Sequence, residues 1–169
     1  MKFLSCSDSS FELITESPDE TFVAGSVTGR HLCPGMLLLL KGSLGMGKTK
    51  FVQGIGDALG ASGVKSPTFI IMREYKGKLP FLHADLYRIE DSEEVDRLGI
   101  EDYLDDGFAA AVEWAERWEN PPSAGRIDIE FEGSGDERRL IFTLRGDETG
   151  KEFAAIAQDM RSIALTEEL

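Results

Sequence analysis

Cysteines and long apolar runs are scarce in this chain of 169 residues. Its two thiols, Cys6 and Cys33, form neither a CxxC motif nor a Cys/His pair, so the sequence indicates neither a disulfide framework nor a zinc site. Apolar runs such as 36–40 do not exceed five residues, whereas a helix needs about 20 to cross a bilayer. The N-terminus also lacks the basic and then apolar layout of a signal peptide. We therefore expect a cytoplasmic chain with no membrane contact.

Basic residues are also few, with 18 against 31 acidic residues and a net charge of −13. A surface this negative repels the phosphate backbone that dominates affinity for nucleic acids, so direct, non-specific binding of DNA or RNA is not expected. Proteins and small molecules are the partners that the charge favours. The length and the 41% hydrophobic content predict one globular domain over residues 1–169.

The apolar patterning predicts an α/β fold. Residues 1–16 alternate weakly and are either an edge strand or a flexible lead-in. Ser17 and Pro18 suit the start of a helix, since serine caps a first turn and proline needs no amide hydrogen there. The apolar run 36–40 predicts a strand buried on both faces. It is followed by a glycine-rich loop and by a helix that Gly60 ends.

The second half of the chain alternates between further strands and helices. Residues 68–74, 79–86 and 108–112 have strand composition, and a short helix closed by Gly99 is expected from residue 92. Alternation in 127–131 and 140–144 around a Gly-Ser-Gly-Asp turn predicts an antiparallel hairpin. A helix is expected within 146–169. The class is thus a sheet flanked by helices with an antiparallel C-terminal portion.

Residues 42–49 carry the strongest chemical signal, because Gly-Ser-Leu-Gly-Met-Gly-Lys-Thr fits G-x-x-x-x-G-K-[ST]. Glycines let the backbone curl so that successive N–H groups point at phosphate oxygens, and the following helix adds its N-terminal dipole. Lys48 would reach the β- and γ-phosphates, and the Thr49 hydroxyl would ligate Mg²⁺. The preceding buried strand and the following helix are the context that this motif requires.

A phosphate-binding loop of this kind needs an acidic group on a neighbouring strand to hold magnesium or its waters. Asp85 and Glu113 each end an apolar strand, and ligands of open α/β sheets bind at the carboxyl ends of strands. The residues by themselves favour neither carboxylate. Ser66 and Thr68 follow the loop helix, where nucleotide hydrolases place a segment that senses the γ-phosphate, although an ordinary turn fits equally well. His83 is interpreted as a buried or supporting histidine rather than a catalytic one.

The ordered set of motifs resembles the TsaE (YjeE) family of small bacterial ATPases needed for threonylcarbamoyladenosine modification of tRNA. The resemblance covers about residues 17–145 and includes a Ser-Pro-Thr-Phe string at 66–69, His-Ala-Asp-Leu-Tyr-Arg at 83–88 and Glu-Trp at 113–114. It implies a P-loop sheet flanked by helices, with ATP and Mg²⁺ bound. Two differences concern charge near the phosphates, because the family commonly has Asp at the position of Ser43 and often Thr at that of Lys50.

The resemblance also implies residue roles. Thr49 and Glu113 are implied to bind the metal, and Asp85 is implied to matter for hydrolysis. Ser66 and Thr68 would form a switch-like segment. The implied catalytic residues are Lys48, Ser66, Thr68, Asp85 and Glu113. The implied nucleotide-binding residues are Pro18, Gly45, Met46, Gly47, Lys48, Thr49, Lys50 and Arg138, of which Pro18 and Arg138 lie near the base.

The family's implied partners are TsaD, which carries the transferase chemistry, and TsaB. The resemblance further implies that ATP hydrolysis by the small subunit resets the complex between cycles, and that tRNA, modified at position 37, is contacted only indirectly. No arginine finger is identifiable, so slow turnover is expected without partners. Two alternatives stay open from the residues: a small-molecule kinase that uses the same loop, and a nucleotide-gated scaffold that binds ATP without appreciable hydrolysis.

Overall fold

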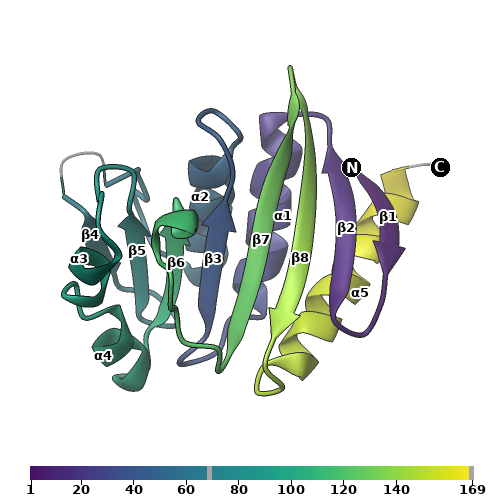
Figure 1. The fold of residues 1–169 in the computed structure, drawn as a ribbon. Helices are drawn as coiled ribbons and strands as arrows, with labels where there is room; N and C mark the ends of the chain where they lie inside the picture. The colour runs from purple at the N-terminus through teal and green to yellow at the C-terminus, as the bar shows by residue number, and fades with distance from the viewer. Residues whose placement is uncertain (68–69, 168–169) are drawn as a thin grey trace.

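The structure is a computed structural model that describes residues 1–67 and 70–167. Within these residues, eight strands form one mixed sheet in the order β1-β2-β8-β7-β3-β6-β5-β4 (Figure 1). The strands are β1 (Lys2–Cys6), β2 (Ser10–Thr15), β3 (Leu37–Lys41), β4 (Met72–Tyr75), β5 (Phe81–Asp85), β6 (Ala109–Glu113), β7 (Arg126–Ser134) and β8 (Glu137–Arg145). The helices are α1 (Pro18–Arg30), α2 (Lys48–Leu59), α3 (Ser92–Asp96), α4 (Ile100–Asp105), the 3₁₀ turn η1 (Ala115–Arg117) and α5 (Gly150–Glu167). The expected α/β class is confirmed.

The centre of the sheet is parallel. Strand β3 pairs in parallel with β6 on one side and β7 on the other, and β5 pairs in parallel with β6. All four leucines of 37–40 are inaccessible to solvent, as a strand covered on both faces requires. The carboxyl ends of β3, β5 and β6 consequently meet at one edge of the sheet, where the loop after β3 also lies.

The flanks are antiparallel and differ in places from expectation. The N-terminal segment forms two strands, with β1 at the edge and β2 paired to β8, because Ser7–Ser9 turn the chain back on itself. The strand expected from residue 68 begins at Met72; residues 68 and 69 lie outside the described part. Helix α4 was not predicted, because Gly99, interpreted as the end of α3, also serves as the N-cap of α4.

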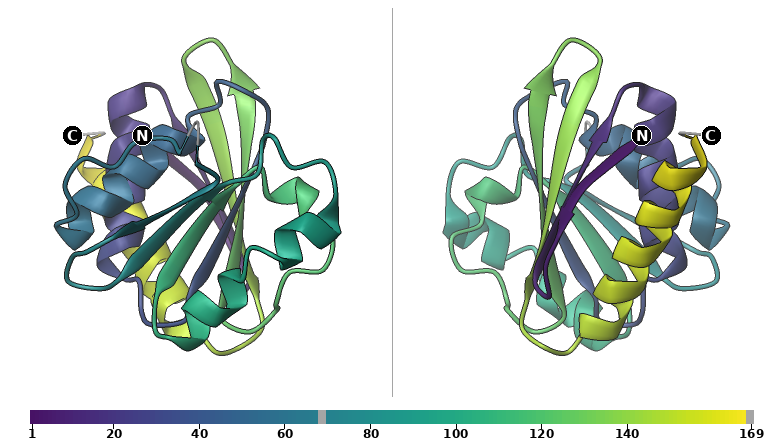
Figure 2. Two further views of the ribbon diagram at one scale, coloured as in Figure 1. Left: turned by 90° about the vertical axis from the view of Figure 1, so that its left-hand side faces the viewer. Right: turned by 90° about the vertical axis from the view of Figure 1, so that its right-hand side faces the viewer.

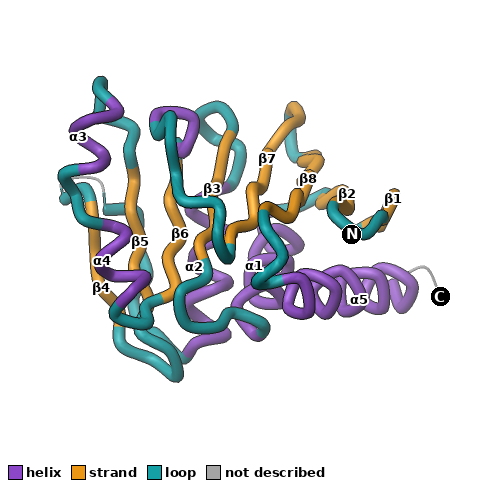
Figure 3. The backbone as a smooth tube through the Cα atoms, turned by 60° about the horizontal axis from the view of Figure 1, so that its bottom comes forward, coloured by secondary structure: helices purple, strands orange, loops and turns teal. Residues whose placement is uncertain are grey.

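Helices cover the two faces unequally. Helices α1, α2 and α5 lie on one face, and α3 and α4 lie on the other (Figures 2 and 3). Each face has its own hydrophobic core, the larger one beneath α1, α2 and α5. Where the structure describes the chain, α3 and α4 lie over the β4–β5–β6 side, and no helix covers the same face of β7, β8 and β2 (Figure 1). None of the described helices combines the length and apolar character needed to cross a membrane.

Helices α1 and α2 approach each other through glycines. A Cβ added at Gly25 would lie 1.9 Å from the carbonyl oxygen of Phe51, and one added at Gly54 would lie 2.0 Å from that of Phe22. The two helix backbones are therefore so close at these positions that only glycine, which has no Cβ, fits. The predicted cap is present as well, because the Ser17 hydroxyl accepts a hydrogen bond from the Glu20 amide at 3.2 Å.

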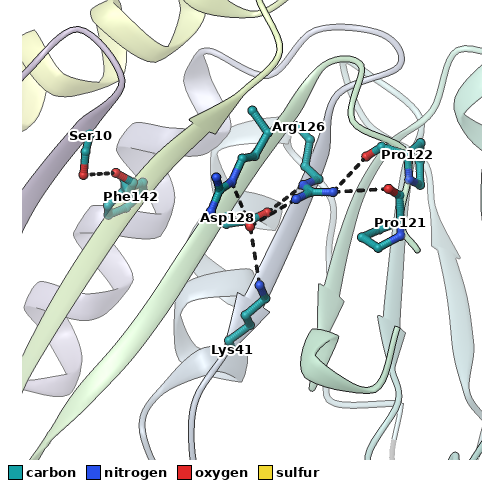
Figure 4. A network of polar contacts seen from close by, with 8 residues as sticks. Ser10, Lys41, Pro121, Pro122, Arg126, Asp128 and Phe142 are labelled. Atoms are coloured by element: carbon teal, nitrogen blue, oxygen red, sulfur yellow. Dashed lines mark hydrogen bonds and ion pairs between the residues drawn. The ribbon is translucent and has the colours of Figure 1, made fainter. Parts of the chain in front are cut away.

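The part of the α3–α4 face that no described helix covers carries a charged cluster on β7 (Figure 4). Asp128 is 2% exposed and lies 2.8 Å from Nε of Arg126. Its Oδ2 atom is 3.3 Å from Nε of Arg145 on β8 and 3.4 Å from Nζ of Lys41 on β3. Three cations from three strands thus surround one carboxylate, and they hold β3, β7 and β8 together where no helix packs.

Candidate nucleotide-binding site

The glycine-rich loop runs from the end of β3 to the first turn of α2. Gly47 is the N-cap of α2, with φ at 93°, and no side chain caps the helix. Gly45 has φ at 78°, and an added Cβ there would have nothing within 4 Å. The first amides of a helix have no acceptor within the helix, so those of α2 remain available to an external anion. The loop therefore has the backbone geometry of an anion cradle.

Lys48 lies beneath this loop and is 4% exposed. Its ammonium group donates to the carbonyl of Gly42 and, at 2.9 Å, to that of Ser43. It also lies 4.3 Å from the ring centre of Trp114. Burial lowers the pKa of Lys48, and the nearby carboxylates, Glu113 foremost, oppose that shift. The lysine is thus a partly desolvated cation whose present acceptors are neutral carbonyls.

Glu113 ends β6 and is 3% exposed. The Thr49 hydroxyl lies 3.0 Å from each of its carboxylate oxygens, and Nε2 of His83 lies 2.8 Å from Oε1. Among the described residues, no lysine or arginine forms an ion pair with this carboxylate. Hydrogen-bond donors rather than a lysine or arginine ion pair therefore hold Glu113 beside the first turn of α2.

Asp85 ends β5 and is paired in register with Glu113 across the two parallel strands. It is more exposed than Glu113, and its Oδ2 atom accepts a hydrogen bond of 3.2 Å from the Ser66 hydroxyl. Its Oδ1 atom accepts one of 3.0 Å from the Tyr87 amide. The two carboxylates that the residues alone did not distinguish therefore differ in environment: Glu113 contacts Thr49, whereas Asp85 contacts the Ser66 segment.

These groups surround one cavity of about 420 Å³. It is lined by Leu44, Gly45, Met46, Gly47, Lys48, Thr49, Ser66, Asp85, Tyr87, Glu113 and Trp114. Sequence reasoning did not assign Leu44, Tyr87 or Trp114 to the site, although Tyr87 and Trp114 directly follow its carboxylate segments. Their rings lie 4.9 Å apart, and Trp114 has φ at 58°, a strained value for a residue with a side chain.

Three predicted residues lie elsewhere. Pro18 and Arg138 line a second, smaller cavity of about 80 Å³ together with Thr21, Gly45, Gly47 and Asp136, and Arg138 donates to the Gly45 carbonyl at 3.1 Å. Lys50 points toward α1, with its Nζ atom 3.8 Å from Asp19. Thr68 lies outside the described residues. The small cavity adjoins the phosphate loop on the side of α1.

The oxygen donors of the main cavity fit Mg²⁺. The Thr49 hydroxyl and the Glu113 carboxylate are hard ligands, and magnesium binds through one or two such groups while keeping waters and substrate phosphates. Over residues 1–67 and 70–167 there is no group of three or more His, Cys, Asp or Glu side chains that could form an all-protein metal site.

Comparison with known proteins gives one consistent result. A family model described as threonylcarbamoyl adenosine biosynthesis protein TsaE matches residues 15–141. The tRNA threonylcarbamoyladenosine biosynthesis protein TsaE of Bacillus subtilis is 40% identical over 136 residues, which cover 79% of this chain and 85% of the relative. The protein of the same name from Synechocystis is 41% identical over 122 residues, covering 69% and 77%. A crystal structure of YdiB from Bacillus subtilis is similar with a TM-score of 0.71 and 29% identity, covering 89% of this chain and 95% of that one.

Proposed function

Because this chain belongs to the TsaE family, we propose that it is a Mg²⁺-dependent ATPase subunit required for threonylcarbamoyladenosine modification of tRNA at position 37. In this proposal the 169 residues form one ATPase domain that acts with TsaD and TsaB. Hydrolysis resets the complex rather than transferring the carbamoyl group. The observation that carries the ATPase role is the single cavity shared by the phosphate loop, Lys48, Thr49 and Glu113.

The proposed binding step follows from the charges in this cavity. The amides of Gly45 to Lys50 and the Lys48 ammonium would hold the triphosphate, because a phosphate offers the lysine charged acceptors in place of the carbonyls of Gly42 and Ser43. Thr49 and Glu113 would hold the metal. Bound Mg²⁺ would neutralise charge that develops on the β- and γ-phosphate oxygens. Phosphoryl transfer to water needs this positioning more than covalent chemistry, so few further groups are required.

The attacking water would be oriented from the other side of the cavity. Asp85 is held there by Ser66 and by the Tyr87 amide, and it remains partly open to solvent. A carboxylate fixed by two donors keeps an oxygen lone pair for a third partner such as water. We assign Asp85 this role and give Ser66 and Thr68 that of a segment responsive to the γ-phosphate. Pro18 and Arg138 border the small cavity where the base region would lie.

The proposed partners also agree with the charge. A net charge of −13 disfavours contact with tRNA, so TsaD and TsaB would bind the nucleic acid while this subunit supplies hydrolysis. No membrane component is involved in this proposal.

Single-turnover hydrolysis of γ-labelled ATP, with and without TsaD and TsaB, tests the function. We expect slow phosphate release alone, faster release with the partners, and loss of release in Lys48→Ala. Lys78→Ala is the matched control, since Lys78 is an exposed lysine whose ammonium group donates to the Ala58 carbonyl at 3.4 Å, and it does not line the nucleotide cavity. ATP binding without release under any condition would indicate a scaffold instead. A phosphorylated metabolite formed with stoichiometric ADP would indicate a kinase.

A further inference from the structure

His83 is a fully buried histidine in the fold that the proposed function does not use. We propose that His83 is a positioning residue, which orients the Glu113 carboxylate so that Glu113 and Thr49 together hold the magnesium of the bound nucleotide. This inference rests on the proposed function and adds to it a residue that touches neither nucleotide nor metal.

The sheet register brings His83 to Glu113. In the parallel pair β5–β6, His83 is opposite Ala111, and Asp85 is opposite Glu113. Side chains two residues apart share one face of a sheet, so Ala111 and Glu113 both lie on the face of His83. Ala111 carries only a methyl group, which leaves room for the imidazole to extend diagonally toward Glu113. The resulting separation between Nε2 and Oε1 is 2.8 Å.

The direction of this hydrogen bond follows from the groups present. An ionised carboxylate only accepts, so Nε2 must carry the hydrogen. The other ring nitrogen, Nδ1, is buried and has no hydrogen-bond partner among the described residues. Among the described residues, the hydrogen bond from Nε2 to Glu113 is thus the polar contact that orients this imidazole.

The orientation of Glu113 would otherwise be loose. The terminal torsion of a glutamate is broad, so a single donor does not fix the plane of its carboxylate. Here His83 holds Oε1 from within the sheet, while the Thr49 hydroxyl lies 3.0 Å from both oxygens on the side of the cavity. Because the Thr49 hydroxyl donates its hydrogen to Glu113, the lone pairs of the Thr49 oxygen stay free for a metal. Supporting hydrogen bonds of this kind usually change metal affinity by about 10- to 100-fold.

Two amide variants separate positioning from packing. The amide nitrogen of glutamine falls near Nε2 of the histidine it replaces, whereas that of asparagine falls near Nδ1 and does not reach Glu113. The measurement is Mn²⁺ affinity in the presence of ADP, by electron paramagnetic resonance, together with ADP affinity without metal and the melting temperature. We expect His83→Asn to weaken Mn²⁺ binding by about 10-fold or more. His83→Gln should stay close to the parent, and ADP affinity without metal should be unchanged in both.

Each other result overturns the inference. Equal Mn²⁺ affinity in the parent and both variants would show that Glu113 needs no support from His83. Equal weakening in both variants, or a loss of ADP affinity without metal, would indicate a packing role only. A lower melting temperature in both variants with unchanged Mn²⁺ affinity would indicate the same. Failure of the proposed function is distinguishable, because in that case the parent protein itself would bind neither ADP nor ATP.

Discussion

Glu113 and Asp128 are two carboxylates buried to nearly the same degree, in two different halves of the sheet. Asp128 lies where no described helix covers the sheet, and Arg126 and Lys41 lie within ion-pair distance of it (Figure 4). Arg145 on β8 lies within ion-pair distance as well. Glu113 lies at the carboxyl end of the parallel centre, where its partners are the Thr49 hydroxyl and His83. One charge is compensated by several fixed cations, and the other is held by hydrogen-bond donors.

The contrast distinguishes a structural carboxylate from one suited to binding. A buried charge is costly unless it is paired, so the three cations around Asp128 make it part of the fold. Hydrogen bonds orient the Glu113 carboxylate, but no lysine or arginine ion pair among the described residues compensates its charge. A carboxylate in such a setting attracts an external cation. Burial alone therefore does not reveal the role of a carboxylate, whereas the charge of its neighbours does.

The largest expected effect comes from Glu113→Gln, which removes the charge and keeps the shape. We expect ATP turnover to fall by about 100- to 1000-fold, as for the loss of one electrostatic group from an active site. Stability should hold or rise, because a buried charge without a lysine or arginine ion pair is removed. Steady-state turnover and urea unfolding would measure the two effects. Glu116→Gln, at an exposed residue three positions further along the chain, is the control. A fall in turnover of less than 10-fold in Glu113→Gln would contradict the contrast between Glu113 and Asp128.

Asp128→Asn should show the opposite pattern. The change leaves the mostly buried Arg126 facing a neutral amide, which should lower the free energy of unfolding by about 3 kcal/mol. ATP affinity should be unaffected, because Asp128 does not line the nucleotide cavity. Urea titration and calorimetry with ATP would report both quantities. Glu130→Gln is the matched control on the same strand, and a drop in ATP affinity without loss of stability would reverse our assignment.

A smaller effect is expected from Thr49→Val, which replaces a hydroxyl with a methyl group of similar size. The Mg²⁺ concentration for half-maximal turnover should rise by about 10- to 100-fold, because the metal loses a ligand and Glu113 loses a donor. Thr49→Ser retains the hydroxyl and should behave like the parent. Similar magnesium requirements in the valine and serine variants would show that this hydroxyl is not used.

The smallest effect is expected at the edge of the Asp128 cluster. Arg145 is half exposed, so Arg145→Met removes a cation that water already screens. Exposed ion pairs contribute about 0.2–1 kcal/mol, and Asp128 would still have Arg126 and Lys41. Thermal unfolding at low and high salt would measure the change. A loss of stability comparable to that of Asp128→Asn would mean that Arg145, rather than Arg126, is the main partner of Asp128.

The loop and its carboxylates could be predicted from the sequence because each depends on local features. The curl at residues 42–49 follows from the glycine spacing, and Asp85 and Glu113 were found as the ends of apolar strands. The contact between His83 and Glu113 could not be found in this way. It depends on how β5 is registered against β6, and the 23 residues of 86–108 separate the two strands.

The Asp128 cluster was missed for a related reason. Its four charges come from three strands, whereas the alternation in 127–131 and 140–144 predicted only a hairpin. The two N-terminal strands were expected as one segment, because weak alternation does not show where a turn reverses the chain. Local chemistry is thus readable from the sequence, whereas pairing between distant strands requires the fold.

The glycine contact between α1 and α2 has a consequence for how this protein tolerates change. The spacing of these helices leaves no room for a methyl group at Gly25 or Gly54, and α1 carries Thr21, which lies 3.3 Å from where a Cβ on Gly47 would stand. An alanine at either glycine would therefore push the two helices apart. It would also shift Thr21, which packs against the phosphate loop at Gly47. The absence of a Cβ atom at Gly25 and Gly54 therefore helps to fix the position of the phosphate loop, although neither glycine lines the nucleotide cavity.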